Sequence, residues 1–253
     1  GQVYREITYS YDDSGNRSQE ITTLNGVKTV KDYTYGTGNL LLGYTVTTDE
    51  KKTDEIKYTY DKNGNLTGEY VIFENGKECF INSETDFSSF MKQVYKSLNC
   101  SYPKFYKMDD LSKLAFIASE IILKNEEEKD IALLFSNNEA SLDTDIKHHH
   151  SIQKPADYYP SPAIFVYTLP NITIGEVSIR HQLKSESTFF VAPTYQVDYM
   201  HKYAAYLLQT KKAKKVLCGW VHYLNGSYSA HFYLVENNGK LPHTQEQIFK
   251  IIR

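Results

Sequence analysis

The segment TFFVAPTYQVDYMHKYAAYLL, residues 188–208, has the pattern of a buried strand that turns sharply into an amphipathic helix. Such a turn suits a nucleophile, because the helix N-terminus lowers the pKa of a thiol and its free N–H groups stabilise an oxyanion. The turn contains neither Cys nor Ser and consists of Pro193, Thr194, Tyr195 and Gln196. The sequence therefore predicts a nucleophile elbow without a conventional nucleophile.

The hydroxyl of Thr194 is a poor replacement for a thiol. It loses its proton only at very high pH unless a base lies beside it. We therefore predict that no covalent acyl intermediate forms at this turn.

Other residues that could do chemistry have simpler interpretations. His148, His149 and His150 are adjacent, so on an extended loop they would point in different directions, and no spaced carboxylate or thiol completes a metal site. We expect no metal ion and no cofactor. His181 is expected at the end of a strand and His201 on the surface of a helix.

The chain has 253 residues, of which 41% are hydrophobic, enough for one large domain or two small ones with a core. Its formal net charge of −3 gives no electrostatic reason to expect nucleic acid or an anionic membrane as a partner. No run of about 18 apolar residues is present to span a bilayer, and the N-terminus lacks the apolar core of a signal peptide. Because the chain begins with Gly, the removal of an upstream leader stays open.

The three cysteines, Cys79, Cys100 and Cys218, lie far apart in the sequence. They form neither a disulfide framework nor a CxxC motif, which favours a reducing compartment. We therefore expect a cytoplasmic protein.

Residues 2 to about 78 contain three versions of one unit, in which alternating aromatic and β-branched residues lead into a Gly-Asn turn and a return strand. The period of two places one set of side chains on each face of a sheet. Gly15, Gly38 and Gly64 are expected to supply the positive φ of tight hairpin turns. Residues 1–78 are therefore predicted to be an all-β domain of antiparallel hairpins in one sheet.

These units resemble the YD repeats of Rhs-type cell-surface and toxin proteins. The matching residues are Tyr11-Asp12 with Gly15-Asn16, Tyr60-Asp61 with Gly64-Asn65, and a degenerate Tyr35 with Gly38-Asn39. Residues 65–78, NLTGEYVIFENGKE, have a more distant similarity to MORN-type repeats.

The tyrosines of these units have two interpretations. The simpler interpretation is that they pack within the sheet and bind nothing. The tyrosines meant are Tyr4, Tyr9, Tyr33, Tyr44, Tyr58 and Tyr70. The alternative is an exposed surface for carbohydrate or peptide, which would fit an exported protein.

From about residue 79 the alternation stops. Helical spacing predicts one helix that begins at Thr85 or Asp86, a second that begins at Asp109 or Asp110, and a third over residues 195–209. Continuously apolar runs predict buried strands of one sheet at Ile131–Ser136, Thr188–Val191 and Lys215–Val221. Helices that alternate with buried strands predict an α/β layered domain at residues 79–253.

Residues from about Cys79 to Glu236 resemble the N-terminal half of the thiolase-like β-ketoacyl synthases. The matching stretches, in the family's order and spacing, are YPKFYKMDDLSKLAFIASEIIL, IALLFSNNEASLDTD, PSPAIFVYTLPNITIGEVSIRHQLKSESTFFV and KKVLCGWVHY. The resemblance implies half of a layered α/β/α fold.

The family's nucleophilic Cys stands at the elbow before the long buried helix. Counting back from Gly219, which matches the end of a family strand, places this position on Thr194, or with a small offset on Tyr195 or Gln196. The resemblance also implies that the family's two catalytic His residues lie in a second half, beyond Arg253. A Gln at or near the elbow is similar to the chain-length-factor subunits, which keep the fold and lose the Cys.

The resemblance implies a catalytically degenerate subunit that pairs with an active β-ketoacyl-ACP synthase in acyl chain elongation, as in aryl polyene or flexirubin-type pathways. The alternatives are a small 3-oxoacyl-ACP synthase active by itself and a surface binding module based on the repeats. In the family, the strand before the elbow pairs with its counterpart in the second subunit of a dimer. That strand is Thr188, Phe189, Phe190 and Val191, which as a lone edge would expose unpaired backbone groups.

Two charged stretches remain. Residues 125–130, NEEEKD, are expected to be a solvated loop. Residues 209–215, QTKKAKK, have two interpretations, a solvated helix end and a docking site for the acidic face of an acyl carrier protein.

Overall fold

The computed structural model describes residues 5–39, 41–57, 59–60, 66–67, 70–74, 77–82, 86–153 and 160–252. The chain divides into two compact units, Gly1–Phe90 and Met91–Arg253. The boundary near residue 78 stays a prediction.

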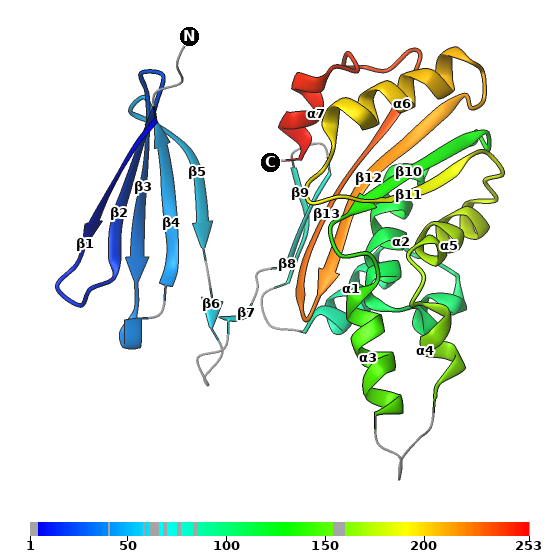
Figure 1. Cartoon of the computed structure of the whole chain (residues 1–253), viewed down its shortest axis with the longest axis horizontal. Coiled ribbons are helices and arrows are strands. Elements are labelled where there is room, and N and C mark those ends of the chain that lie inside the picture. The colour runs from blue at the N-terminus through cyan, green and yellow to red at the C-terminus, as the bar shows by residue number, and fades with distance from the viewer. Residues whose placement is uncertain are drawn as a thin grey trace. The chain divides into compact units, whose positions relative to one another are not determined.

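The first unit contains an antiparallel sheet in which neighbouring strands follow one another in sequence, in the order β1-β2-β3-β4-β5 (Figure 1). Its elements are β1 (Arg5–Tyr11), β2 (Arg17–Leu24), β3 (Val27–Tyr35), the 3-10 helix η1 (Thr37–Asn39), β4 (Leu41–Thr48) and β5 (Lys51–Lys57). Two further hairpins are formed by β6 (Thr59–Tyr60) with β7 (Leu66–Thr67) and by β8 (Tyr70–Glu74) with β9 (Lys77–Asn82).

Consecutive antiparallel hairpins are therefore confirmed, but the expectation of one sheet to residue 78 is wrong. The main sheet ends at β5, and each later hairpin forms a two-stranded sheet of its own. The β6–β7 ladder joins only two residue pairs, which is too short to extend the main sheet.

The hairpin turns use positive φ angles at a few positions. Gly15 has φ +81°, as predicted, and the turn between β2 and β3 is Asn25-Gly26 with φ 51° and 87°, the pattern that a tight hairpin favours. In the turn that contains Gly38, positive φ is found at Asn39, with φ 60°. Asp61, Gly64, Asn65 and two of the predicted packing residues, Tyr4 and Tyr58, lie outside the described residues.

One face of the main sheet is aromatic. Tyr33 and Tyr44 pack with ring centroids 5.3 Å apart, which agrees with the packing interpretation. Tyr9 and Tyr11 on the edge strand are 42% and 62% exposed, and the guanidinium of Arg17 lies 4.3 Å from the ring centre of Tyr9.

The second unit is an α/β layer around a four-stranded sheet of order β11-β10-β12-β13. Its strands are β10 (Ile131–Asn137), β11 (Ser187–Val191), β12 (Lys215–Leu224) and β13 (Ser227–Glu236). The helices are α1 (Phe87–Ser97), which begins before the unit boundary, then η2 (Pro103–Lys107), α2 (Asp110–Leu123), α3 (Leu142–Ile152), α4 (Pro162–Val166), α5 (Asn171–His181), α6 (Val197–Gln209) and α7 (Gln245–Ile251).

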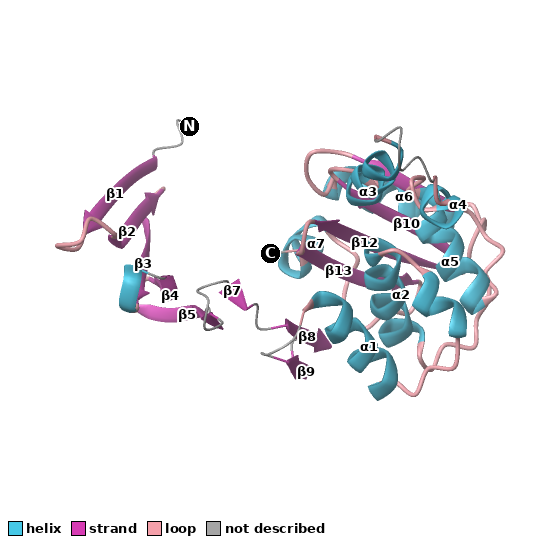
Figure 2. Ribbon diagram, turned by 90° about the horizontal axis from the view of Figure 1, so that it is seen from below, coloured by secondary structure: helices cyan, strands magenta, loops and turns pink. Residues whose placement is uncertain are grey.

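The three predicted strands lie in this one sheet, so the α/β fold class is confirmed. β11, β10 and β12 are parallel, and β13 pairs antiparallel with β12. Helices α2 and α5 pack on one face, and α6 and α7 on the other (Figure 2). All seven residues of β10 are buried, because both faces of the sheet are covered.

Two helix starts follow the predicted capping rules. The Asp86 carboxylate accepts a hydrogen bond from the Ser89 N–H at 3.1 Å, whereas Thr85 lies outside the described residues. The Asp109 carboxylate accepts from the Ser112 N–H at 3.0 Å. No helix in the described part of the chain is long and apolar enough to cross a membrane.

Candidate functional site

The elbow lies between the end of β11 and the start of α6. Just beyond Val191, the Ala192 N–H donates to the Asn137 carbonyl at 2.9 Å, which ties the elbow to the end of β10. This is the carboxyl edge of the parallel strands, where open α/β sheets bind their ligands.

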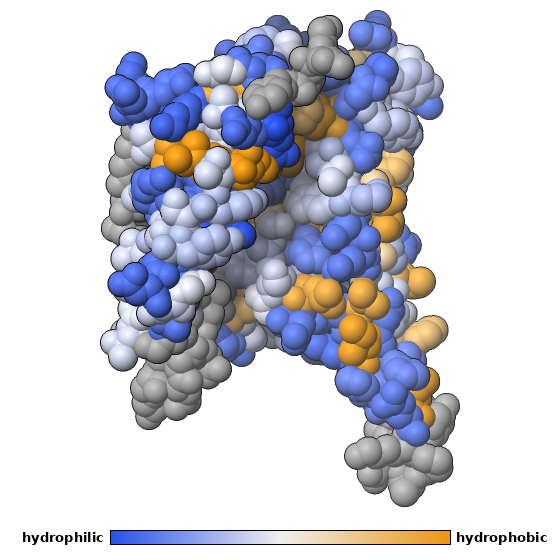
Figure 3. Space-filling model, turned by 60° about the vertical axis from the view of Figure 1, so that its left-hand side comes forward, coloured by the Kyte–Doolittle hydropathy of each residue, from blue (hydrophilic) through white to orange (hydrophobic). Residues whose placement is uncertain are grey.

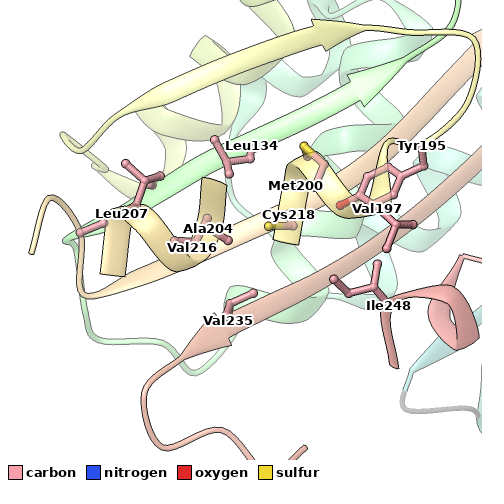
Figure 4. Close-up of a cluster of buried hydrophobic side chains, with 12 residues drawn as sticks. Leu134, Tyr195, Val197, Met200, Ala204, Leu207, Val216, Cys218, Val235 and Ile248 are labelled. Atoms are coloured by element: carbon pink, nitrogen blue, oxygen red, sulfur yellow. The ribbon is translucent and has the colours of Figure 1, made fainter. Parts of the chain in front are cut away.

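The three elbow residues point to different surroundings. Thr194 and Gln196 are exposed, whereas Tyr195 is only 8% exposed and points into the core under α6 (Figure 4). The Gln196 side-chain amide donates to the Thr194 carbonyl at 3.0 Å and lies 3.3 Å from the Thr194 hydroxyl. Gln196 is a hydrogen-bond donor to Thr194, and no basic side chain contacts the Thr194 hydroxyl in the described structure.

Tyr195 is part of a buried polar chain. Its hydroxyl lies 2.9 Å from the Tyr233 hydroxyl, and Tyr233 interacts with the Cys218 thiol. Burial raises the pKa of Tyr195 and of Tyr233 well above the usual range for tyrosine. Burial also raises the pKa of Cys218 to about 12, so this thiol stays protonated and unreactive near neutral pH.

The helix after the elbow is held by an apolar core. Met200, Ala204 and Leu207 project from α6 onto alternate residues of the sheet (Figure 4). The sheet residues in this cluster include Ala132, Leu134, Val216, Cys218 and Val235. The packing of α6 on the sheet therefore holds the elbow in place, and this packing does not require a nucleophile at the turn.

A small pocket of about 120 Å³ opens beside the elbow. Its lining residues are Ser136, Phe190, Val191, Ala192, Gln196, Tyr199 and Met200. Ser136 is 3% exposed, and its hydroxyl has no hydrogen-bond partner in the described structure. The sequence did not single out Ser136, because only the register of β10 against β11 places it opposite Phe190.

The predicted interface strand is an edge of the sheet. Thr188, Phe189 and Phe190 are half-buried, and Val191 is 55% exposed. In a parallel ladder every second residue of a strand bonds through its backbone to the same neighbouring strand. The Glu186 carbonyl and the Ala192 N–H both bond to β10, so the even-numbered residues between them face β10. Phe190 therefore bonds to β10, whereas the backbone groups of Phe189 and Val191 face the edge that no described strand covers.

Exposed apolar side chains also occur on elements other than β11. On the face drawn in Figure 3, hydrophobic residues form several separate patches among hydrophilic ones. In the neighbouring helices α3 and α4 and the turn after them, the exposed apolar residues are Leu142, Ile146, Phe165, Val166 and Leu169.

A charged cluster that the sequence did not predict joins α2 to α5. The Glu120 carboxylate accepts from the Arg180 guanidinium at 2.5 and 3.1 Å, and His181 Nε2 lies 3.2 Å away. Burial opposes ionisation, but hydrogen bonds from His181 and Arg180 outweigh it and lower the pKa of Glu120 to about 2. Burial and the nearby Glu120 raise the pKa of Cys100 to about 12. His181 is the last residue of α5, so its expected place at a strand end is wrong.

The three adjacent histidines lie on a helix, not on the expected loop. His148, His149 and His150 belong to α3, whose first turn carries the helix-favouring acids Asp143 and Asp145. Within the described ranges, no group of three or more His, Cys, Asp or Glu side chains could hold a metal ion.

His201 is on α6 as predicted, but it is only partly exposed. Its Nε2 lies 2.9 Å from the His243 carbonyl oxygen, and the two rings are 4.7 Å apart.

The two charged stretches, NEEEKD and QTKKAKK, meet at the amino ends of β10 and β12, whereas the elbow lies at the carboxyl end of β10. Lys214 pairs with Glu128 at 3.0 Å, and Lys215 pairs with Glu126 and Glu236, each at 2.7 Å. The NEEEKD loop is thus an ion-pairing partner and not only a solvated segment. The thirteen residues of α6, about 20 Å in length, separate these lysines from the elbow, and docking of an acyl carrier protein at QTKKAKK stays a prediction.

No protein-family model and no curated protein matches this chain. It is similar to a solved structure described as the ishigamide ketosynthase/chain length factor, with 20% identity, 53% of this chain and 45% of that chain covered, and a TM-score of 0.46.

Two further solved structures are similar. One is a ketosynthase in complex with its chain length factor from Xenorhabdus doucetiae, with 17% identity, 49% and 50% coverage, and a TM-score of 0.39. The other is a type II polyketide acyl-carrier protein in complex with its ketosynthase, with 17% identity, 56% and 47% coverage, and a TM-score of 0.40. This chain spans about half the length of these chains, and with such TM-scores they do not contribute to the functional argument.

Proposed function

We propose that residues 79–236 act as a catalytically degenerate subunit of the β-ketoacyl synthase type, comparable with a chain length factor, which pairs with an active ketosynthase during acyl chain elongation. The observation that carries the proposal is the elbow. It has a strand, a sharp turn and an amphipathic helix packed on the sheet, as at a nucleophile site, and its central side chain, Tyr195, is buried in the core. The sequence resemblance supports the same assignment.

The residues at the elbow do not favour covalent chemistry. Thr194 lies beside Gln196, which is not a base, and the thiol of Cys218 is fully buried. The elbow therefore has its shape without an activated nucleophile.

The test is incubation of the whole chain with malonyl- or acyl-acyl carrier protein, followed by measurement of intact mass. We expect the mass of the chain to be unchanged. An added acyl group that is absent in Thr194→Val would contradict the proposal and would favour a small 3-oxoacyl-ACP synthase active by itself.

Pairing is proposed to use the uncovered edge of β11, in a homodimer or a heterodimer. Val191→Pro removes an N–H that faces this edge but leaves the bonds to β10, and edge strands tolerate such a proline. We expect Val191→Pro to stay folded and to lose association, and Val191→Thr, which keeps the N–H, to retain it. Light scattering and co-purification with an active ketosynthase measure both effects.

Phe190→Pro is a less specific variant. It removes a bond to β10 and therefore disturbs the sheet of the chain itself. A wild-type chain that is monomeric and does not co-purify with any ketosynthase would refute the pairing.

A second candidate function concerns the N-terminal sheet. Ile7, Tyr9, Tyr11, Leu24 and Val27 are all at least 36% exposed, and the strand register places them on one face of the sheet. This supports a binding surface for carbohydrate or peptide. Binding of an oligosaccharide array to the whole chain, lost in Tyr9→Ala and Tyr11→Ala, would test it.

A further inference from the structure

The main N-terminal sheet, formed by β1 to β5, has no core within its own unit. None of the described side chains in β1 to β4 is buried. No described helix or strand of the first unit makes an extensive contact with either face of this sheet. A sheet is stable when its apolar face packs against a second layer, because a single layer leaves that face in water. The sheet therefore needs a covering layer.

The two faces of the sheet differ in composition, which shows the face that needs this cover. The strand register places the large apolar and aromatic residues on one face, which we call the tyrosine face. In β1 to β3, the opposite face has two apolar side chains, Ile21 and Val30, among polar ones. The apolar and aromatic residues of the tyrosine face are Ile7, Tyr9, Tyr11, Leu24, Val27, Tyr33, Tyr44 and Val46.

Opposite charges lie side by side in the middle of the tyrosine face. Glu20 of β2 is directly opposite Lys31 of β3 in the ladder, with the carboxylate and the ammonium 3.5 Å apart. The guanidinium of Arg17 lies 3.0 Å from the same carboxylate. The Lys31 side chain is 36% exposed, so its charge is still open to a second partner. A surface with both signs on neighbouring strands can complement a copy of itself.

One two-fold rotation gives this match. Its axis lies between two facing sheets, runs parallel to β2 and β3, and is midway between these two strands. The rotation places β2 over the partner's β3 and leaves the position along the strands unchanged. Glu20 then lies over the partner's Lys31, and Lys31 over the partner's Glu20, two equivalent contacts as an isologous interface requires. Packed sheets cross at about 30°, and contacts close to the axis are the least displaced by that angle.

The same rotation brings aromatic and apolar side chains of the outer strands together. It places β1 over the partner's β4. Tyr9 and Val46 are in one row across the four strands, so Tyr9 lies over the partner's Val46. Two residues further along both strands, Tyr11 lies over the partner's Tyr44. Tyr11 is 62% exposed in the single chain, and an aromatic pair stabilises an interface through both its area and its ring geometry.

The size of the tyrosine face agrees with a specific dimer. The strands β1 to β4 have 7 to 9 residues each. With a rise of about 3.4 Å per residue and about 4.8 Å between strands, they cover about 500 Å². Two such faces bury about 1,000 Å² or more, because side chains add to the flat area, and specific interfaces begin at about this size.

We propose that the tyrosine face packs on the same face of a second copy of this chain and forms a two-layered β-sandwich about a two-fold axis. The occupant is a second copy because one rotation matches opposite charges and also places ring against ring. The inference does not depend on the β11 edge or on the elbow. It gives the face a different occupant from the carbohydrate or peptide of the second candidate function.

The test is a pair of charge reversals in whole chains that also carry Val191→Pro, which prevents pairing through β11, so that association through the N-terminal sheet is measured alone. Sedimentation equilibrium should show a dimer of the Val191→Pro chain. Glu20→Lys puts positive charge at both central positions and Lys31→Glu puts negative charge at both, so each should raise the dimer Kd at least about tenfold. An equimolar mixture of the two variants should form a heterodimer, because opposite charges meet again across the interface.

Tyr11→Asp is a second variant, which disturbs the single chain less because Tyr11 is largely exposed there. It should also separate the copies, because it places a charge against the partner's Tyr44. Lys28→Glu is the matched control, a charge reversal on the opposite face of β3, and should leave the dimer unchanged. Circular dichroism checks that each variant keeps its strands, and if a central charge reversal loses them, Tyr11→Asp and Lys28→Glu decide the test.

The inference is overturned if the Val191→Pro chain is monomeric at high micromolar concentration, if Tyr11→Asp and Lys28→Glu act alike, or if the folded charge variants stay apart in the mixture. An oligosaccharide that binds the tyrosine face of a monomeric chain would overturn it in favour of the second candidate function. Tyr11→Asp in a chain that keeps Val191 should leave co-purification with a ketosynthase unchanged, so failure of the pairing and failure of the sandwich are distinguishable.

Discussion

The tyrosine pair beneath the elbow is open to a quantitative test of how the elbow is held. The hydroxyls of Tyr195 and Tyr233 are 2.9 Å apart, and Tyr195 is 8% exposed. Removing one hydroxyl leaves the other in a largely dry environment. Such an unsatisfied group costs about 1–3 kcal/mol, whereas removing both partners of a buried hydrogen bond can be nearly neutral.

We therefore expect Tyr195→Phe and Tyr233→Phe each to lower the free energy of unfolding by about 1–2 kcal/mol. The double variant should lose no more than either single variant, which gives a coupling energy of about 1 kcal/mol or more. Tyr233→Phe should be the more costly change, because Tyr233 retains its interaction with Cys218 when Tyr195 is replaced.

The assay is urea unfolding followed by the fluorescence of Trp220, the single tryptophan of the chain. Its ring centre lies 6.4 Å from that of Tyr195, so the signal reports on this unit. Tyr206→Phe, at a 46% exposed position, is the control and should change stability by less than about 0.5 kcal/mol. Additive losses in the double variant would refute the reasoning, because they would mean that the two hydroxyls do not depend on each other.

Two further predictions concern the same unit. Gly219→Ala should lower the free energy of unfolding by about 1–3 kcal/mol, because the added Cβ would lie 2.7 Å from the ring of Phe232. Gly175→Ala, in the middle of α5 with open space around it, should raise the free energy of unfolding by about 1 kcal/mol. Urea unfolding measures both, and equal effects of the two variants would contradict this reasoning. Glu120 has a pKa lowered from 4.5 to about 2, so its contribution to stability is present above pH 4.5 and is lost as the pH falls towards 2. Glu120→Gln should therefore flatten the fall in stability between pH 4.5 and 2, and an unchanged pH profile would show that the carboxylate is not the titrating group.

The sequence predicted elements whose signal is local. Continuous apolar runs identified β10, β11 and β12, because a strand covered on both faces has no polar positions. Asp109 identified the start of α2 through its capping position. These predictions needed only neighbouring residues.

The sequence also contains a usable signal for β13, a strand absent from the predicted set. β13 follows Asn225-Gly226, a turn with φ 48° and 85° that favours a hairpin, between two apolar-rich stretches. The α3 helix was missed because three adjacent histidines have weak helix propensity, although its first turn is acidic.

The parts of the candidate site that could not be predicted depend on distant pairs. Arg180 reaches Glu120 across 60 positions of sequence, and Ser136 becomes part of a pocket only through the register of β10 with β11. A single serine at the end of an apolar run gives no sign that its hydroxyl lacks a partner. Only the three-dimensional structure shows which side chains leave it unsatisfied.

The same distinction separates the shape of the elbow from its chemistry. The turn is fixed by the burial of Tyr195 and by the α6 residues Met200, Ala204 and Leu207 packed on the sheet, none of which requires a nucleophile. Loss of a thiol at this position therefore does not remove the forces that hold the strand, the turn and the helix together. An elbow of this construction keeps an apolar pocket and an uncovered edge strand in place without a nucleophile, and the pairing proposed for this chain needs only that edge strand.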